Sequence, residues 1–216
     1  MSDPAMDTQE GKEELEVPAL FREFESSGQP WLGTFWWGRL SENIPDAYRE
    51  AAHRLFDGRQ DGEDAERILL PILYTYRHAI EALLKLSIMA SAVLRHEGQD
   101  DSALDPSDVE QRLKRDLRHK LAQLRDLLNE NLHALQLDSV NDKTSAFLDL
   151  LADLDPSGNA FRFAQQLPDV RVSLDLPRLM VAFDAAYHHL MGVREYLIVQ
   201  VDDQRDWMNY LAGDFE

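Results

Sequence analysis

The sequence predicts an all-α fold, a bundle of four to six helices around one long central helix. Apolar residues recur at helical spacing through most of the chain and make up 44% of it. No segment alternates apolar and polar residues as a half-buried strand does. With 216 residues, the chain is long enough to form one domain with a sizeable core. We therefore expect a single bundle over residues 45–200.

The residues before the bundle divide into two segments. Residues 1–17 are acidic and lack periodicity, so we expect a disordered leader there. Residues 18–44 are rich in aromatic side chains, and Trp31, Trp36 and Trp37 lie among glycines in a stretch too irregular for a helix. Because large aromatic side chains favour burial, this segment is expected to clamp across the bundle or to meet a partner, with base stacking as the alternative.

The first two helices follow from helix start and stop signals. The first is expected to begin near Pro45, a favourable first-turn residue, and to end at Gly58. The second is expected from about Glu63 to His96, before Gly98. Its apolar positions cover more than one face, which requires neighbouring helices on several sides. We identify it as the central helix.

A third helix is expected to open at Pro106 and to run unbroken through Leu132, because leucines recur along it at helical spacing. It carries a basic segment, residues 112–125, with six Lys or Arg side chains against one Asp in a chain whose formal net charge is −18. An acidic protein repels nucleic acid at long range unless such a local surface overcomes the repulsion. The segment is either a solvated helix face paired with neighbouring acids or a binding surface for phosphate.

Two further helices complete the expected bundle. One covers Thr144–Leu154 and is ended by the strong turn signal of Asp155–Gly158. The last long helix opens at Asp175, and residues 201–216 are expected to form a separate short helix or tail.

Composition limits the cellular compartment and the kinds of site. The chain has no cysteine, which excludes disulfides and thiolate ligands to a metal. Its first 20 residues carry six acidic side chains and one lysine, the opposite of a signal peptide. The longest apolar stretch is interrupted by Arg77, Glu81 and Lys85, which suits a buried helix rather than lipid. We expect a cytoplasmic protein without membrane contact.

The same three charged residues are candidates for a site. Arg77, Glu81 and Lys85 are four residues apart and share one face of the central helix, with His78 beside them. Because polar groups on a buried helix need partners, they form either a self-paired ladder that reaches the bundle surface or a surface where His78 or Lys85 contacts an anion.

Metal and cofactor motifs are sparse. Glu50 and His53 have the Glu-x-x-His spacing of carboxylate-bridged metal bundles, but those sites also need two further glutamates that face inward. Phosphate-cradling glycine loops, nucleophile elbows and zinc signatures are also absent. We expect no metal and no cofactor.

Four segments carry a family resemblance. Tyr76–Leu86, with His-Ala-Ile-Glu-Ala-Leu-Leu-Lys in it, resembles the His-Ala-x-Glu-x-x-Leu-Lys helix of HEPN domains. Arg118–Leu124 is similar to that family's Gly-His-Asp-Leu-x-x-Leu helix start, and Phe161–Phe163 resembles its Arg-Tyr-Pro segment. Asp175–Leu197 lies where a final helix closes the family's bundle, and order and approximate spacing match over residues 65–198.

The resemblance implies a homodimer that acts with RNA or a nucleotide. Some members of the family are metal-independent ribonucleases that use an Arg, four to six residues, and then a His, contributed by both subunits at the dimer cleft. Others are non-catalytic partners of nucleotidyltransferases in toxin–antitoxin or defence loci. Here Arg112 and His119 alone have that spacing. Seven residues apart on one helix, they would share a face, with His119 as acid or base and Arg112 stabilising developing charge.

Two departures from the family pattern weigh against catalysis. Leu113 follows Arg112 where the family has a polar residue, and Arg118 and Lys120 replace its Gly and Asp. We therefore expect a non-catalytic module that binds a nucleotide or RNA, with a ribonuclease that uses Arg112 and His119, or a structural interaction bundle, as alternatives. The expected ligand-binding residues are Arg77, His78, Lys85, Arg115, Arg118, Lys120 and Arg162.

Overall fold

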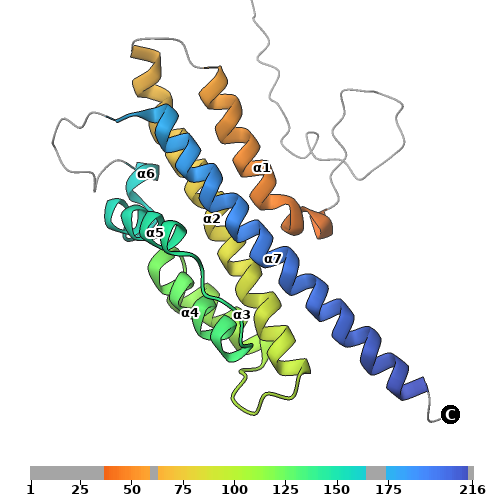
Figure 1. The fold of residues 1–216 in the computed structure, drawn as a ribbon. Helices are drawn as coiled ribbons and strands as arrows, with labels where there is room; N and C mark the ends of the chain where they lie inside the picture. The colour runs from red at the N-terminus through yellow and green to blue at the C-terminus, as the bar shows by residue number, and fades with distance from the viewer. Residues whose placement is uncertain (1–36, 59–62, 164–173, 214–216) are drawn as a thin grey trace, which may run out of the picture. The chain divides into compact units, whose positions relative to one another are not determined.

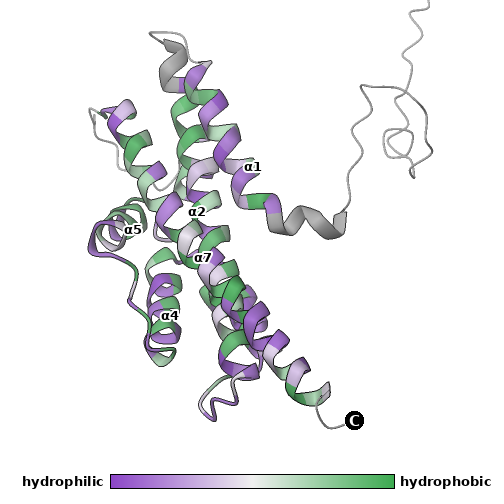
Figure 2. Cartoon of the chain, turned by 45° about the vertical axis from the view of Figure 1, so that its right-hand side comes forward, coloured by the Kyte–Doolittle hydropathy of each residue, from purple (hydrophilic) through white to green (hydrophobic). Residues whose placement is uncertain are grey.

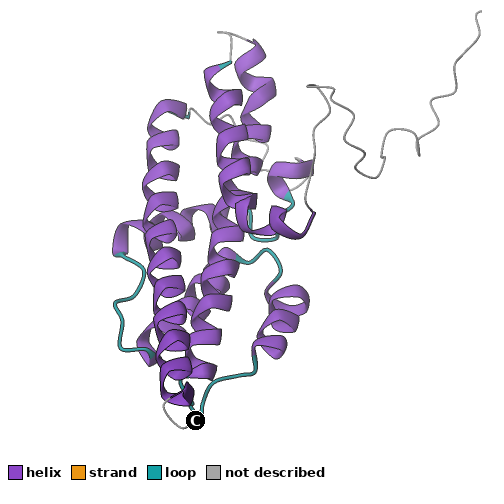
Figure 3. Cartoon of the chain, turned by 90° about the vertical axis from the view of Figure 1, so that its right-hand side faces the viewer, coloured by secondary structure: helices purple, strands orange, loops and turns teal. Residues whose placement is uncertain are grey.

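All regular secondary structure in the described part of the protein is helical, which confirms the all-α prediction (Figure 3). The structure is a computed structural model that describes residues 37–58, 63–163 and 174–213. The predicted leader, Trp31 and Trp36 lie outside these residues. In chain order the elements are α1 (Trp37–Asp57), α2 (Glu63–Glu97), α3 (Pro106–Arg112), the π-helical turn η2 (Leu113–Leu117), α4 (Leu121–Ala134), α5 (Asp142–Leu154), α6 (Ala160–Phe163) and α7 (Leu176–Gly213).

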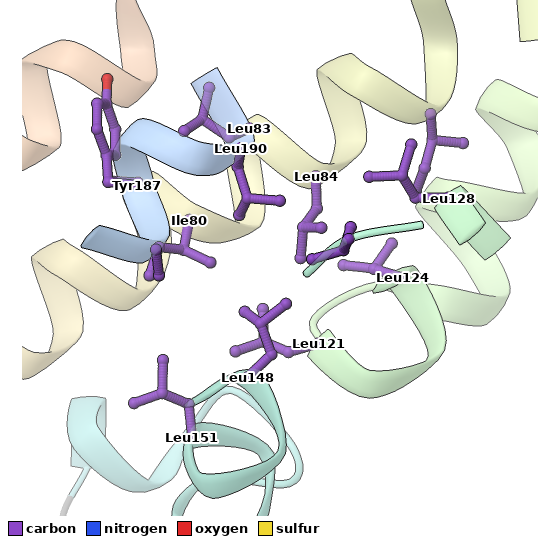
Figure 4. Close-up of a cluster of buried hydrophobic side chains, with 14 of the residues drawn as sticks. Ile80, Leu83, Leu84, Leu121, Leu124, Leu128, Leu148, Leu151, Tyr187 and Leu190 are labelled. Carbon is purple, nitrogen blue, oxygen red and sulfur yellow. The ribbon is translucent and has the colours of Figure 1, made fainter. Parts of the chain in front are cut away.

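The helix α2 is the centre of the bundle, as predicted. It packs most extensively against α7 and α4, with α3 and α6 also in contact (Figure 1). Ile80, Leu84 and Ile88 are fully buried as a result. Figure 4 shows apolar side chains of α2, α4, α5 and α7 converging on this core. The apolar faces of α2 are thus covered largely by helices of the same chain.

The helix α1 begins earlier than predicted. It starts at Trp37 and runs through Pro45, although Pro45 was expected to open it. A proline removes one helical hydrogen bond, but it does not prevent the preceding residues from being helical. The predicted boundary between residues 18–44 and the bundle therefore falls inside a helix.

The helix α7 begins where the sequence predicts, and α5 begins two residues earlier, at Asp142 rather than Thr144, each behind a capping side chain. The side chain of Asn141 accepts a hydrogen bond from the backbone N–H of Thr144, at 2.8 Å. Asp175 accepts one from the N–H of Arg178, at 3.1 Å. Both side chains satisfy backbone donors that the first helical turn leaves without partners.

The last part of the chain corrects the prediction of a separate short helix or tail over residues 201–216. Residues 201–213 instead continue α7, because neither glycine nor proline interrupts the sequence between Gly192 and Gly213. Arg205 forms a bidentate ion pair with Glu97 at the end of α2, at 2.6 and 2.9 Å.

Beyond that ion pair the end of α7 is exposed. Trp207 and Tyr210 are 59% and 61% exposed and stack on each other. Figure 2 shows hydrophobic and hydrophilic residues side by side along these turns. In the described part of the chain, no helix contains a stretch long and apolar enough to cross a bilayer.

Candidate functional site

The basic segment does not form the continuous helix that the sequence predicted. The helix α3 ends at Arg112, and η2 follows as a wider π-helical turn. Arg118 then has a backbone φ of 43°, in the left-handed region that most residues avoid. The helix α4 starts only at Leu121. The prediction that Arg112 and His119 share one helical face is therefore wrong.

Burial of leucines explains this path. Leu113, Leu117 and Leu121 are all buried, and they follow one another at intervals of four residues. Because the wide turn keeps these leucines in the core, the polar residues between them remain outside. His119 lies in the break between η2 and α4, and 46% of its side chain is exposed.

His119 is held by a buried carboxylate. Its Nδ1 lies 2.9 and 3.0 Å from the two carboxylate oxygens of Glu81, whose side chain is 2% exposed. Since a carboxylate accepts hydrogen bonds, Nδ1 must carry the proton, and we assign the neutral ring to that tautomer. Nε2 has no hydrogen-bond partner among the described residues, and in the neutral ring it is the atom that offers a lone pair.

Glu81 is charged and shared among three partners. Lys85 donates to its Oε1 at 2.6 Å, and Nη1 of Arg77 donates to its Oε2 at 3.2 Å. Burial alone would raise the pKa of Glu81, but the Lys85 ammonium and then the His119 imidazole outweigh it, so the pKa lies below its ordinary value. The self-paired ladder of the sequence prediction therefore exists, but Arg77 and Glu81 are buried, and Lys85 reaches the surface.

Arg77 connects the Glu81–His119 pair to the turn that follows α5. Its Nη2 donates to the backbone oxygen of His119 at 2.6 Å and to that of Asp155 at 3.1 Å. Its Nε lies 3.2 Å from Oδ2 of the buried Asp155, close enough for charge attraction but not aligned as a hydrogen bond. With His119 neutral, the two cations and two carboxylates of the cluster balance, as buried charges require.

Several exposed cations surround His119 in the sequence. Arg115, Arg118 and Lys120 are exposed and form no ion pair with a described residue. Lys114 and Arg125, by contrast, are occupied: Lys114 pairs with Glu110 at 2.5 Å, and Arg125 pairs with Asp126 and Asp149. The basic segment therefore has two parts. Lys114 and Arg125 pair with acidic residues of the same chain, whereas Arg115, Arg118 and Lys120 leave uncompensated positive charge on the surface.

The other predicted residues are placed less centrally. Arg112 is half-buried at the end of α3, and no described hydrogen bond or ion pair joins it to His119. Arg162 is exposed on α6, whose first N–H donates to Asp155 at 2.9 Å.

His78 packs among aromatic rings rather than pointing freely at solvent. Its ring meets Tyr48 edge-on at 4.4 Å and lies nearly parallel to Tyr74 at 6.0 Å. Burial is the largest effect on the pKa of His78 and lowers it, and the charge of Lys85 lowers it further against the opposing effect of Glu81. His78 therefore borders the His119 cluster but is held by packing.

Comparison with known proteins returns no match to this chain among family models, curated proteins or solved structures. The functional conclusion therefore comes from the His119 cluster and its surroundings.

Two surface hollows lie elsewhere, on either side of Tyr196 on α7. Leu132, His189 and Val193 line one, and Leu94, Arg95 and Gln200 line the other. No predicted ligand-binding residue lines either of them.

A second polar cluster was missed by the sequence prediction. Oδ1 of Asp184, on α7, accepts hydrogen bonds from Arg49 of α1 and Tyr76 of α2, and Nε2 of His53 lies 3.0 Å from it. Asp46 accepts a hydrogen bond from Tyr187 at 2.5 Å. These contacts join helices that are more than 100 residues apart in the chain, and no local motif announces them.

The Asp184 cluster makes stability depend on pH. Burial would raise the pKa of Asp184, but hydrogen bonds from Tyr76, His53 and Arg49 hold it below its ordinary value of 3.8. The stabilisation is complete above that ordinary value and is lost as pH falls through the lower pKa of the folded state. We expect Asp184→Asn to reduce the free energy of unfolding by about 1–3 kcal/mol at neutral pH.

Chemical denaturation across pH tests this expectation. The gap between wild type and Asp184→Asn should narrow as pH falls below about 4, whereas Asp203→Asn, at an exposed position of the same helix, should match wild type throughout. A gap that stays constant down to acid pH would show that the carboxylate charge contributes nothing.

Proposed function

We propose that the surface around His119 binds the phosphodiester backbone of RNA. The observation that carries the proposal is the arrangement of His119 itself, whose Nδ1 is fixed by Glu81 while the half-exposed ring keeps Nε2 available. When protonated, such a ring donates a charge-assisted hydrogen bond to a phosphate oxygen. It also gives the otherwise balanced cluster a net positive charge.

The neighbouring cations supply the rest of the attraction. Arg115, Arg118 and Lys120 are uncompensated among the described residues, and Lys85 reaches the surface with 29% of its side chain exposed. In a chain of net charge −18, phosphate binding requires such a local positive surface. The resemblance of Tyr76–Leu86 and Arg118–Leu124 to HEPN motifs favours the same kind of ligand.

Salt dependence tests the proposal. Each phosphate contact on a single strand contributes about 0.7 to the slope of log affinity against log salt, so Arg115→Ala/Arg118→Ala/Lys120→Ala is expected to reduce that slope by about 2. The measurement is fluorescence anisotropy of a labelled single-stranded RNA at several salt concentrations.

The matched control is Arg54→Ala/Lys143→Ala/Arg178→Ala, which removes three exposed cations from other parts of the surface. It changes the net charge equally and is expected to leave the slope close to that of wild type. Equal slopes for both triple variants would show that RNA is held elsewhere or not at all.

Metal-independent RNA cleavage is a second candidate, favoured by the Glu81–His119 pair. An imidazole oriented by a carboxylate is the arrangement used for general acid–base catalysis. In this candidate His119 moves the proton, and Arg112, which no described contact joins to His119, stabilises the charge on the phosphate only as the HEPN resemblance implies. Cleavage in the presence of a chelator should then disappear in His119→Ala and fall strongly in Arg112→Ala, and cleavage that persists in His119→Ala would remove the assignment.

Assembly as a homodimer, or with a protein partner such as a nucleotidyltransferase, is part of what the HEPN resemblance implies. The exposed Trp207, Met208 and Tyr210 at the end of α7 favour a contact surface there, because apolar patches on a surface mark interaction sites. Sedimentation velocity over a range of concentrations should show a dimer that Trp207→Ala/Tyr210→Ala weakens. A strictly monomeric wild type would contradict it.

A further inference from the structure

The turn between α5 and α6 lies against His119. It consists of Asp155–Asn159, and its residue Gly158 has a backbone φ of 76°, a conformation that favours glycine. Asp155 anchors the turn through two hydrogen bonds. Its backbone N–H donates to the backbone oxygen of Leu151 at 3.0 Å, and its Oδ1 accepts from the backbone N–H of Ala160 at 2.9 Å. Its position is therefore fixed by the helices on either side.

Gly158 fits against His119 because it has no side chain. A Cβ atom at position 158 would lie 2.4 Å from Cβ and 2.8 Å from Cγ of His119, and 3.3 Å from Nη1 of Arg77. The first two distances are far below any normal carbon–carbon contact. Either His119 or the turn would have to move to admit even a methyl group.

Arg77 couples the two segments that meet here. Its Nη2 donates to the backbone oxygens of both His119 and Asp155, so the backbone of His119 and the start of the turn share one buried guanidinium. Three contacts therefore fix the position of His119. Arg77 binds its backbone oxygen, Gly158 packs against its Cβ and Cγ, and Glu81 accepts a hydrogen bond from its Nδ1.

We infer that Gly158 is a positioning residue for His119, since the absence of a side chain at this position is what lets the imidazole reach Glu81 and keep Nε2 available to a phosphate. The inference deepens the RNA-binding proposal and rests on it for its functional consequence. The geometric part, that Gly158 sets the orientation of the His119 ring, can be measured without RNA.

The test compares wild type, Gly158→Ala and Gly192→Ala. Gly192 is the matched control, because a Cβ added there on α7 meets no atom within 4 Å. Long-range 1H–15N spectra of the neutral imidazoles report which ring nitrogen of His119 carries the proton, and RNA anisotropy reports affinity. In wild type and Gly192→Ala we expect the proton on Nδ1.

In Gly158→Ala we expect the His119 ring to lose its preference for that tautomer and RNA affinity to fall about tenfold, as in His119→Ala. Combining Gly158→Ala with His119→Ala should weaken binding no further than either alone, because both act through the same ring. An unchanged tautomer together with wild-type affinity in Gly158→Ala would overturn the inference.

The outcomes separate the inference from the function on which it rests. If wild type binds no RNA, the proposed function fails, and the tautomer of His119 in Gly158→Ala still decides whether Gly158 positions the ring. If Gly158→Ala does not fold, Gly158→Asn is measured in its place, because asparagine tolerates a positive φ but still places a Cβ atom against His119. An unchanged tautomer together with wild-type affinity in Gly158→Asn would overturn the inference.

Discussion

Arg77→Leu is expected to destabilise the protein by about 3–5 kcal/mol, because removing one partner of a buried ion pair leaves an uncompensated charge in the core. The side chain of Arg77 is 3% exposed and that of Asp155 fully buried. Without the guanidinium, Asp155 keeps its bond from Ala160 but has no cation beside it, and the backbone oxygen of His119 loses its donor.

Urea denaturation of Arg77→Leu beside Arg178→Leu measures this effect. Arg178 is also an arginine near a carboxylate, but its side chain is 87% exposed, so its loss is expected to change stability by no more than about 0.5 kcal/mol. Adding Asp155→Asn to Arg77→Leu should cost less than the sum of the two single changes. A loss below about 1 kcal/mol for Arg77→Leu would contradict the role given to the buried cluster.

Phe183→Ala is expected to cost about 3–5 kcal/mol, the usual range for deletion of a buried aromatic side chain. Phe183 on α7 is fully buried. It stacks on Tyr76 of α2 at 4.5 Å and meets Phe147 of α5 edge-on at 5.0 Å. Its loss leaves a cavity where three helices meet.

The matched control is Val181→Ala, two residues away on the same helix but 69% exposed, with an expected change within about 0.5 kcal/mol. Thermal unfolding followed by circular dichroism distinguishes the two variants. Similar melting temperatures for both would show that α7 is not held to the bundle through Phe183.

The helical architecture could be predicted because it follows from local patterns. The long apolar stretch of α2 ends near Gly98, α5 ends at the turn signal that starts with Asp155, and Asp175 opens α7. The end of α7 was missed for a local reason too. Residues 201–213 mix polar and apolar side chains, and most of them are exposed, so no buried stripe showed that the preceding helix continues through them.

The site could be predicted only in part, because its geometry is non-local. His119 and Glu81 were both identified, but as members of separate motifs 38 residues apart. The break at Arg118 has neither glycine nor proline to mark it, since the buried leucines decide the path of the backbone. Gly158 was seen as part of a turn signal, and its contact with His119 depends on packing that no spacing rule provides.

The central claim is that His119 belongs to an RNA-binding surface. The most direct test is a fluorescence anisotropy titration of labelled single-stranded RNA in the presence of a chelator. It compares wild type, His119→Ala and His133→Ala. His133 is the control, an exposed histidine near the end of α4. Loss of a charge-assisted hydrogen bond predicts about tenfold weaker binding for His119→Ala and unchanged binding for His133→Ala. Equal affinity of all three proteins, or no binding by wild type, would contradict the claim.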